Sequence, residues 1–201
     1  MSSAVGMPFH LGEYDRDTLT EAYNQTLKDW QLYLFDGFGS YDPDVIYNRI
    51  EYLANGLDCR VIFLDHLSIL MSGLDGDERK MIDQTMTRLR SLVERTGIAL
   101  FLVSHLRRAT GDKNHEEGAR VTLGQLRGSA AIAQLSDAVI GIERDQQSTD
   151  ERSGTILRVL KNRYSGETGV ASTLAYDQDT CKFHEIESSD DEVEFDATSD
   201  F

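Results

Sequence analysis

The sequence predicts an α/β fold in which a mostly parallel β-sheet is flanked by helices. Two patterns support this expectation. Short apolar runs stop at polar residues, as in residues 61–65 and 98–105. Between such runs, apolar residues recur every three or four positions, which is the spacing of an amphipathic helix. Strands that alternate with helices are typical of a parallel sheet covered by helices.

Two helices and a strand are expected before residue 60. A capping box, Thr-Leu-Thr-Glu at residues 18–21, predicts a helix that reaches about Leu27. Residues 31–35 are predicted to form a strand. Asp42 followed by Pro43 is suited to the N-cap and first position of a second helix, which ends near Gly56. One face of that helix would hold the apolar residues Val45, Ile46, Ile50, Leu53 and Leu57.

The middle of the chain holds two predicted strands separated by a long helix. Residues 61–65, Val-Ile-Phe-Leu-Asp, form a continuous apolar run of the kind that a strand buried on both faces requires. After a polar loop at residues 68–77, a helix with a regular apolar face ends at Gly97. Residues 98–103 predict the next buried strand, which stops at Ser104 and His105.

The remaining elements are shorter. Residues 107–118 predict a loop, and the elements that follow are a helix at 129–135, strands at 138–142 and 156–160, and an edge strand at 172–176. Residues 185–201 carry eight acidic and no basic side chains, a composition that predicts a disordered tail. Removing these eight charges from the net charge of −15 leaves −7 for the other 184 residues. Any basic surface for nucleic acid must therefore be local.

Length and cysteine content limit the organisation and the compartment. At 201 residues the chain is suited to one domain, and we divide it into an N-terminal helical segment (1–29), an α/β domain (30–184) and an acidic tail (185–201). Cys59 and Cys181 show neither metal-ligand spacing nor a disulfide framework, which favours a reducing cytoplasm. Residues 1–10 lack the features of a signal peptide, and no apolar run reaches the roughly 20 residues of a membrane span. We therefore expect a soluble, intracellular protein.

Two candidate site residues lie at the ends of predicted strands. Asp65 would place a carboxylate at the edge where open α/β sheets bind ligands, and it could hold the water shell of Mg²⁺ there. His105, at the end of the next strand, could hydrogen-bond a phosphate or an ordered water. Either residue could instead be structural, because many buried strands end in a polar residue.

Three further polar residues stand near the ends of later elements. Gln134 lies on a short helix predicted after small residues, which allow close approach of the backbone. Lys161 and Arg163 follow a strand at positions i and i+2, so their side chains would point the same way, as cations that insert into an anionic site do. The alternative is that all three are ordinary surface residues.

Short blocks along the chain together resemble one protein family. They are residues 61–66 (VIFLDH), 77–83 (DERKMID), 103–106 (VSHL), 115–118 (HEEG), 126–129 (LRGS), 134–137 (QLSD), 161–164 (KNRY) and 168–169 (TG). In this order they resemble the helicase half of the primase-helicases of short-tailed lytic phages, in the DnaB-type branch of the RecA-like ring helicases. The resemblance runs from Trp30 to Tyr176, and the acidic tail ending in Asp-Phe matches as well.

The resemblance implies a RecA-like fold and an ATP-dependent replicative DNA helicase. Such a helicase assembles as a ring of subunits, translocates on single-stranded DNA and unwinds duplex DNA at the replication fork, with Mg²⁺ and ATP or dTTP as cofactors. Asp65 would bind Mg²⁺, and His105 and Gln134 would sense the γ-phosphate. Arg163 would be an arginine finger that reaches a neighbouring subunit, supported by Lys161.

The resemblance also implies several binding surfaces. Arg144 and Tyr176 match residues that sandwich the nucleotide base. Phe201, at the end of the acidic tail, would dock the replicative DNA polymerase. The cell would be a phage-infected bacterium. The loops at residues 68–77, 107–118 and 144–154 would face the central channel, and the phosphate contacts in the second loop would be Arg107, Arg108 and Lys113.

The sequence departs from the family pattern in two ways. The 201 residues contain no G-x-x-x-x-G-K-[ST] phosphate loop, and they lack the family's catalytic glutamate. Ala133 stands where relatives carry arginine. We expect that this chain alone does not hydrolyse ATP and that another chain supplies the phosphate-loop half. Two alternatives stay open: a non-catalytic RecA-like binding module that tethers DNA polymerase or DNA, and a different RecA-like ATPase such as a recombinase.

Overall fold

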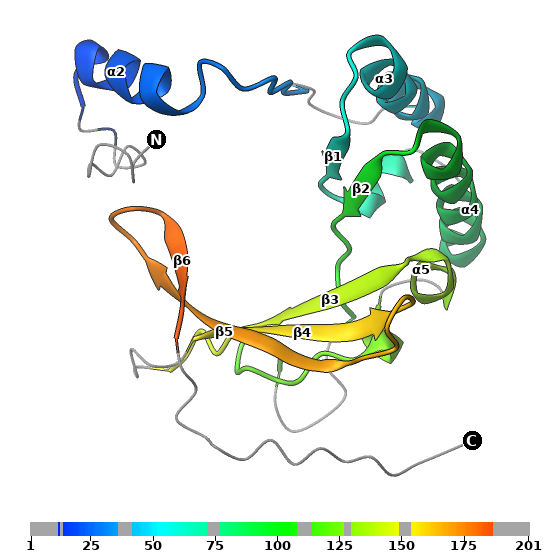
Figure 1. The fold of residues 1–201 in the computed structure, drawn as a ribbon. Helices are drawn as coiled ribbons and strands as arrows, with labels where there is room; N and C mark the ends of the chain where they lie inside the picture. The colour runs from blue at the N-terminus through cyan, green and yellow to red at the C-terminus, as the bar shows by residue number, and fades with distance from the viewer. Residues whose placement is uncertain are drawn as a thin grey trace.

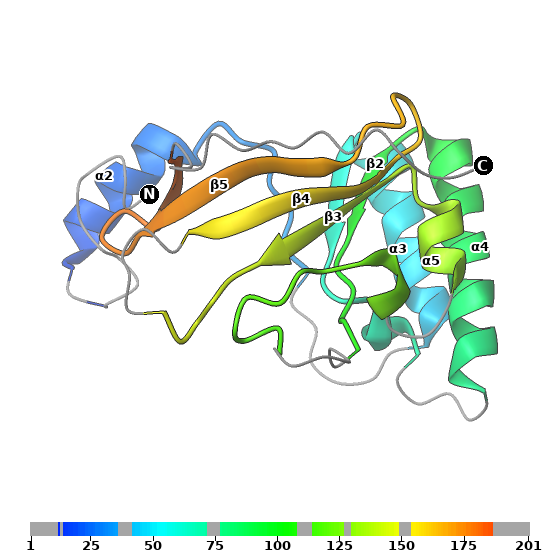
Figure 2. The ribbon, with the colours of Figure 1, turned by 90° about the horizontal axis from the view of Figure 1, so that it is seen from below.

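The computed structural model describes residues 12, 14–35, 42–71, 77–107, 114–126, 130–148 and 154–186. Figures 1 and 2 show the chain in two views at right angles. None of the described helices is long and apolar enough to cross a membrane. In chain order the elements are α2 (Arg16–Thr26), α3 (Pro43–Gly56), β1 (Val61–Leu64), the 3-10 helix η2 (Leu67–Leu70), α4 (Glu78–Thr96), β2 (Ala99–Leu102), the 3-10 helix η3 (Leu123–Gln125), α5 (Ala130–Leu135), β3 (Ala138–Glu143), β4 (Thr155–Asn162), β5 (Gly169–Asp177) and β6 (Lys182–Glu185).

Helix α2 begins before the predicted capping box. The N-cap is Asp15, whose carboxylate accepts hydrogen bonds from the Thr18 amide at 2.7 Å and the Thr18 hydroxyl at 3.1 Å. Thr18 therefore lies inside the first turn, and the prediction that it is the N-cap is wrong. The reason is that an aspartate already stands three residues earlier, where it can satisfy the first free amides of the helix.

Helices α3 and α4 agree with the sequence. Asp42 caps α3 by accepting a hydrogen bond from the Asp44 amide at 2.9 Å, and Pro43 occupies the first position. Helix α4 ends at Gly97, whose φ of 71° is the left-handed conformation that glycine adopts without a steric penalty. Part of the predicted polar loop at residues 68–77 is helical, since η2 forms its first turn.

The described strands form two separate sheets. Strands β1 and β2 pair in parallel, with Val61 opposite Ala99 and Leu64 opposite Leu102. Strands β3, β4, β5 and β6 form an antiparallel sheet in that order. The predicted strand at residues 172–176 is present within β5, but its predicted position at the edge of the sheet is wrong, because the chain turns back after β5 and adds β6 along it. No apolar alternation marks β6, whose sequence is Lys-Phe-His-Glu.

The main core lies between the parallel pair and two helices. Figure 1 shows α3 and α4 on the same side of β1 and β2. Val45, which was predicted to lie on the apolar face of α3, is instead exposed. Helix α5 packs against α4 and buries Ile132 in the same core. The buried hydrophobic residues from the two helices and β1 are Ile46, Tyr47, Ile50, Ile82, Met86, Leu89, Leu92 and Ile62.

The other face of the parallel pair is exposed. Phe63 of β1 is 73% exposed and Phe101 of β2 is 50% exposed, and their rings stack with centroids 4.8 Å apart. The prediction that both strands are buried on both faces is therefore wrong for the described part of the chain, because helices cover only one face. Strand β3 also exposes apolar side chains on one face, namely Ile140 and Ile142.

Residues 31–35 do not form a strand. They have no regular secondary structure and make no strand pairing with the described residues, and all five side chains are exposed, with Leu34 at 84%. The apolar character of this segment predicted a strand, but β-structure requires a neighbouring strand to satisfy its backbone hydrogen bonds.

The exposed aromatic pair generates a test. We expect the folded chain to bind the apolar dye 1-anilinonaphthalene-8-sulfonate, because contiguous exposed apolar surface is a binding surface for apolar groups. A double variant, Phe63→Ser with Phe101→Ser, should reduce the dye fluorescence at least roughly twofold while changing the free energy of unfolding by less than about 1 kcal/mol. The control is Tyr164→Ser, which removes an aromatic ring that is 84% exposed outside this face. Equal dye binding by the double variant would contradict the prediction.

Candidate functional site

The carboxyl ends of β1 and β2 bring Asp65 and His105 into adjacent segments. Residues that follow two parallel strands leave the sheet at the same edge. Backbone hydrogen bonds extend the pairing past both strands: the Val103 amide donates to the Leu64 carbonyl at 3.0 Å, and the Leu67 amide donates to the Val103 carbonyl at 2.9 Å. The acid and the histidine therefore follow neighbouring strands at one edge of the sheet.

A second histidine lies against His105. The rings of His66 and His105 meet edge to face, with centroids 4.4 Å apart. The Nδ1 atom of His66 is buried and has no hydrogen-bond partner among the described residues. Sequence reasoning did not single out His66, because its contact depends on how the two strand ends are paired. The only signal was its position directly after Asp65.

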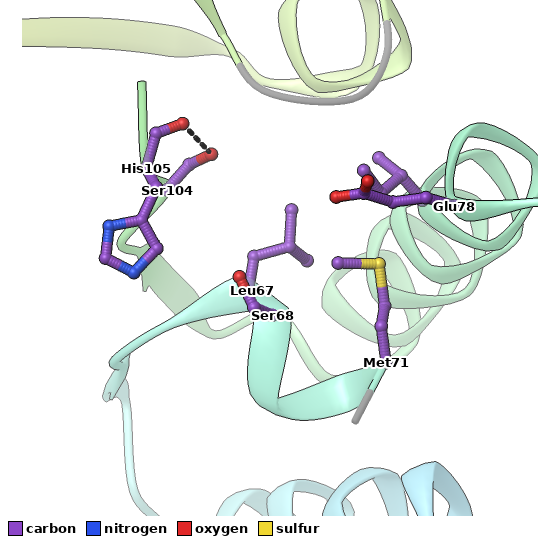
Figure 3. A pocket seen from close by; sticks show the side chains of 7 residues that line it. Leu67, Ser68, Met71, Glu78, Ser104 and His105 are labelled. Carbon is purple, nitrogen blue, oxygen red and sulfur yellow. Dashed lines mark hydrogen bonds between the residues drawn. The ribbon is translucent and has the colours of Figure 1, made fainter. Parts of the chain in front are cut away.

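A small pocket opens beside His105 and is shown in Figure 3. Its wall on the α4 side carries Glu78, whose carboxylate points toward the space, while Ser104 and His105 form the opposite wall. The pocket therefore combines polar groups from three elements with an apolar base. The lining residues are Leu67, Ser68, Met71, Glu78, Ile82, Ser104 and His105.

Asp65 itself is suited to a hydrated cation. Its side chain is exposed and makes no hydrogen bond or ion pair to another described residue. The described residues contain no group of three or more His, Cys, Asp or Glu side chains that could hold a metal ion. Mg²⁺ usually keeps several waters and takes one or two carboxylates together with phosphate oxygens. A single free carboxylate fits Mg²⁺ carried by a nucleotide.

Lys161 and Arg163 both reach the carboxyl end of α5. The Lys161 ammonium donates to the carbonyls of Ala133 at 2.6 Å, Gln134 at 3.2 Å and Ser136 at 2.9 Å. The Arg163 Nη2 donates to the same Gln134 carbonyl at 2.8 Å. The two cations therefore point the same way, as their spacing predicts, and they satisfy carbonyls that a helix end leaves free.

Asp137 joins this cluster to α4. Its carboxylate pairs with Arg163 Nη1 at 3.1 Å and with Arg90 Nη1 at 2.7 Å. Arg90 also donates to Glu94, and these two hydrogen bonds raise the pKa of Arg90 above its ordinary value. Sequence reasoning named Asp137 only as part of a block, because its partners lie on two other elements.

Arg144 and Tyr176 lie at the same end of the antiparallel sheet. Arg144 directly follows β3, and Tyr176 is next to the last residue of β5. The Tyr176 ring contacts the Phe183 ring of β6 at 5.1 Å between centroids. A hydrogen bond with Cys181 raises the pKa of Tyr176. The structure thus adds Phe183 and Cys181 as neighbours that the sequence did not connect with this position.

Some predicted site residues lie outside the described part of the chain. They are Arg108, Lys113, Phe201, residues 127–129 and residues 149–153. Arg107 is described and exposed. Gln134 is exposed on α5, and the hydrogen bonds that hold it involve its backbone carbonyl.

A buried ion pair between β3 and β4 was missed by sequence reasoning. Arg158 of β4 donates to both carboxylate oxygens of Glu143 at 2.8 and 3.0 Å, and the Val121 amide donates to one of them at 2.8 Å. Burial alone would raise the pKa of Glu143, but the hydrogen bonds from Arg158 and Val121 outweigh it, so the pKa lies below its ordinary value of 4.5. An acid and an arginine inside two apolar strands were the available signal.

The Glu143 pair predicts a pH dependence of stability. Because the folded-state pKa of Glu143 is lowered, its stabilising contribution is complete above its ordinary value of 4.5 and is lost as the pH falls through the folded-state pKa. Glu143→Gln should lower the free energy of unfolding by about 3 kcal/mol at neutral pH, since it leaves Arg158 without its partner. At low pH, the free energies of unfolding of Glu143→Gln and of the native chain should become more similar.

Urea unfolding followed by circular dichroism at about pH 7 and about pH 3.5 measures both quantities. The control is Glu51→Gln, which removes a surface ion pair with Arg95 at 3.3 Å and should cost less than about 1 kcal/mol. If both variants lose the same stability at both pH values, Glu143 does not have the assigned role.

Comparison with known proteins identifies clear relatives. The sequence profile of the DnaB-like helicase C-terminal domain matches residues 7–185. A DNA helicase/primase of Enterobacteria phage T3 is 40% identical over 161 residues, which are 80% of this chain and 28% of that protein. A probable plasmid replicative DNA helicase of Chlamydia muridarum is 28% identical over 176 residues, which are 88% of this chain and 37% of that protein. The chain thus spans well under half the length of these relatives.

Two solved structures share the fold. A structure described as an ATPase domain superimposes with a TM-score of 0.68 at 19% identity, covering 87% of this chain and 62% of that chain. A KaiC-like protein of Pyrococcus horikoshii superimposes with a TM-score of 0.52 at 11% identity, covering 82% of this chain and 64% of that chain. The fold is RecA-like, as the resemblance implied.

Proposed function

The chain belongs to the DnaB-like helicase C-terminal domain family, and we propose that it forms part of an ATP-dependent replicative DNA helicase that translocates on single-stranded DNA. The observation that carries the proposal is the placement of Asp65 and His105 in adjacent segments at the carboxyl ends of β1 and β2. An acid that can hold the water shell of Mg²⁺ and a histidine that can form a hydrogen bond are suited to part of a site for a Mg²⁺–nucleotide.

In this proposal Asp65 holds a Mg²⁺–nucleotide through the water shell of the cation. When bound, Mg²⁺ would offset negative charge on the phosphate oxygens. His105 would hydrogen-bond the γ-phosphate or an ordered water, and its contact with His66 would restrict the orientation of its ring. The nucleotide would be ATP or dTTP. Arg144 and Tyr176 would hold its base from the end of the antiparallel sheet.

Gln134, Lys161 and Arg163 would act at the contact between neighbouring subunits of a ring. Lys161 and Arg163 both donate hydrogen bonds to the Gln134 carbonyl. A shift of α5 would therefore change the positions of both cations. We propose that Arg163 uses its remaining donors as an arginine finger in the neighbouring subunit's site. The guanidinium fork is suited to the spread charge of a transferring phosphoryl group.

A second polypeptide segment would supply the phosphate loop. The 201 residues contain no G-x-x-x-x-G-K-[ST] motif, so the backbone amides and lysine that cradle phosphates must come from elsewhere. The exposed apolar face that holds Phe63 and Phe101 supports this, because an unfinished core is what such a segment would cover. The acidic tail ending in Phe201 would dock the replicative DNA polymerase.

The isolated chain should show no DNA-stimulated ATPase activity. The physical reason is that a carboxylate and a histidine alone cannot hold the charged triphosphate without the amides and the lysine of a phosphate loop. Release of inorganic phosphate from ATP, with and without single-stranded DNA, is the measurement. Turnover by the pure chain that Asp65→Ala abolishes would contradict this prediction and reveal an unrecognised phosphate site.

Arg163 should act in trans once a polypeptide with the phosphate loop completes the helicase. Arg163→Ala should lower hydrolysis about 10³-fold or more with nucleotide binding largely retained. Arg163→Lys should be nearly as inactive, although it can still pair with Asp137, because a point charge lacks the guanidinium fork. Arg95→Ala, which removes an exposed ion pair with Glu51, is the matched control.

Mixing Arg163→Ala with Asp65→Ala subunits tests the arrangement directly. Each subunit would lend its intact group to one neighbouring site, so the mixture should recover part of the activity that both variants lack. A mixture that stays as inactive as its components would rule out the trans role. A binding module that only tethers DNA or polymerase would show no hydrolysis in any combination, and DNA binding would not depend on Asp65.

A further inference from the structure

His115 opens the block His-Glu-Glu-Gly, at the end of the loop that the resemblance places at the central channel; neither the resemblance nor the proposed function assigns a role to His115 itself. Its Nε2 lies 2.9 Å from the carbonyl oxygen of Arg107, eight residues earlier in the chain. A carbonyl can only accept, so Nε2 carries the proton in this contact. The other ring nitrogen, Nδ1, is buried and has no partner among the described residues. Among the described residues, the ring therefore makes one hydrogen bond, and its partner is Arg107.

The backbone of Arg107 is held on both sides. Its amide donates to the Gln125 carbonyl at 2.8 Å, while its carbonyl accepts from His115. Next to it, Leu106 forms an antiparallel bridge with Leu126. An exposed arginine usually stands on a backbone with fewer restraints. Here the side chain is exposed, but the peptide that carries it is fixed by two different segments.

The turn that carries His115 is itself anchored. The Gly118 amide donates to the His115 carbonyl at 3.2 Å, and the Asn114 amide donates to the Glu117 side chain at 2.8 Å. The Gln146 amide donates to the Glu116 carbonyl at 2.8 Å, which joins the turn to the segment after β3. His115 therefore cannot move without moving a turn that is attached to the antiparallel sheet.

Gly118 keeps this attachment close. Its φ is +75°, and a Cβ atom added there would lie 3.1 Å from the Asp145 side chain. Glu117 and Asp145 form an antiparallel bridge at the same place. A glycine is required both by the backbone conformation and by the close approach to the neighbouring segment. Gly118 thus holds the turn that carries His115 close to the segment after β3.

We propose that His115 is a positioning residue for DNA binding, which holds the Arg107 peptide so that the guanidinium meets a phosphate of single-stranded DNA. This inference rests on the proposed translocation on single-stranded DNA and on the phosphate contact that the resemblance implies for Arg107. A backbone that is already fixed loses less conformational entropy when its side chain binds a phosphate. Releasing the Arg107 carbonyl should therefore weaken DNA binding through Arg107, without any contact between His115 and DNA.

The experiment measures binding of the full chain to a fluorescein-labelled oligothymidylate of about 20 nucleotides by anisotropy, from about 50 to about 200 mM salt. Arg107→Ala should weaken binding and reduce the slope of affinity against salt by about 1. His115→Ala should weaken binding roughly tenfold and reduce the slope in the same direction. The double variant should bind no more weakly than Arg107→Ala alone, because both changes remove one contact.

Two conservative variants separate positioning from loss of the fold. His115→Gln places an amide donor near the position of Nε2 and should restore most of the affinity. His115→Asn places its amide near the position of Nδ1, too short to reach Arg107, and should behave like His115→Ala. His184→Ala, which removes an exposed histidine from β6 beside Asp177, is the matched control and should bind as the native chain does. Thermal unfolding by circular dichroism verifies that each variant is folded.

The outcomes separate this inference from the proposed function. Native affinity in His115→Ala, or additive losses in the double variant, would overturn the positioning role while leaving the DNA contact of Arg107 intact. Equal weakening by His115→Gln and His115→Asn would also overturn it. A native chain that binds no DNA even at low salt would overturn the proposed DNA surface, and the role of His115 with it.

Discussion

Parallel pairing of β1 with β2 is the constraint on which the candidate site depends. Since both strands run the same way, the residues after them must leave the sheet at one edge. The two backbone bonds that involve Val103 extend this pairing past the strands and hold the segments of Asp65 and His105 side by side. An antiparallel pair would have sent these residues to opposite ends. The contact between the His66 and His105 rings follows from the same pairing, because each histidine lies just beyond its strand.

A cluster of charges around the end of α5 ties the two sheets to each other. Lys161 and Arg163 come from the end of β4, Asp137 precedes β3, and Arg90 belongs to α4 in the main core. Lys161 and Arg163 bind carbonyls at the helix end, and Arg163 and Arg90 both pair with the Asp137 carboxylate, although none of these side chains is deeply buried. Such partly exposed contacts contribute modestly to stability. Their larger effect is to make the position of Arg163 depend on the position of α5, through the Gln134 carbonyl.

The chain has a RecA-like fold, but one face of the β1–β2 pair is exposed. The chain superimposes on a solved ATPase domain over 87% of its length, yet the stacked pair of Phe63 and Phe101 faces outward. Apolar runs in β1 and β2 are what a strand covered on both faces needs. Within the described residues, α3 and α4 cover one face only (Figure 1). The sequence of these strands thus reflects a core larger than the one that the described residues complete.

The sequence by itself determined most of the helices and strands and the polar residues that follow two of the strands. The spacing of apolar residues and the capping residues were sufficient to predict α3 and α4, because Asp42 and Gly97 each act on backbone groups within a few residues of their own position. The apolar runs were sufficient to place Asp65 and His105 at strand ends. Only the tertiary structure decided the rest: which strand face is covered, the addition of β6, and contacts such as Glu143 with Arg158 and His115 with Arg107. The physical reason is range. Caps and periodicity are local interactions, whereas a strand pairing or a buried ion pair depends on partners that the sequence separates and the fold brings together.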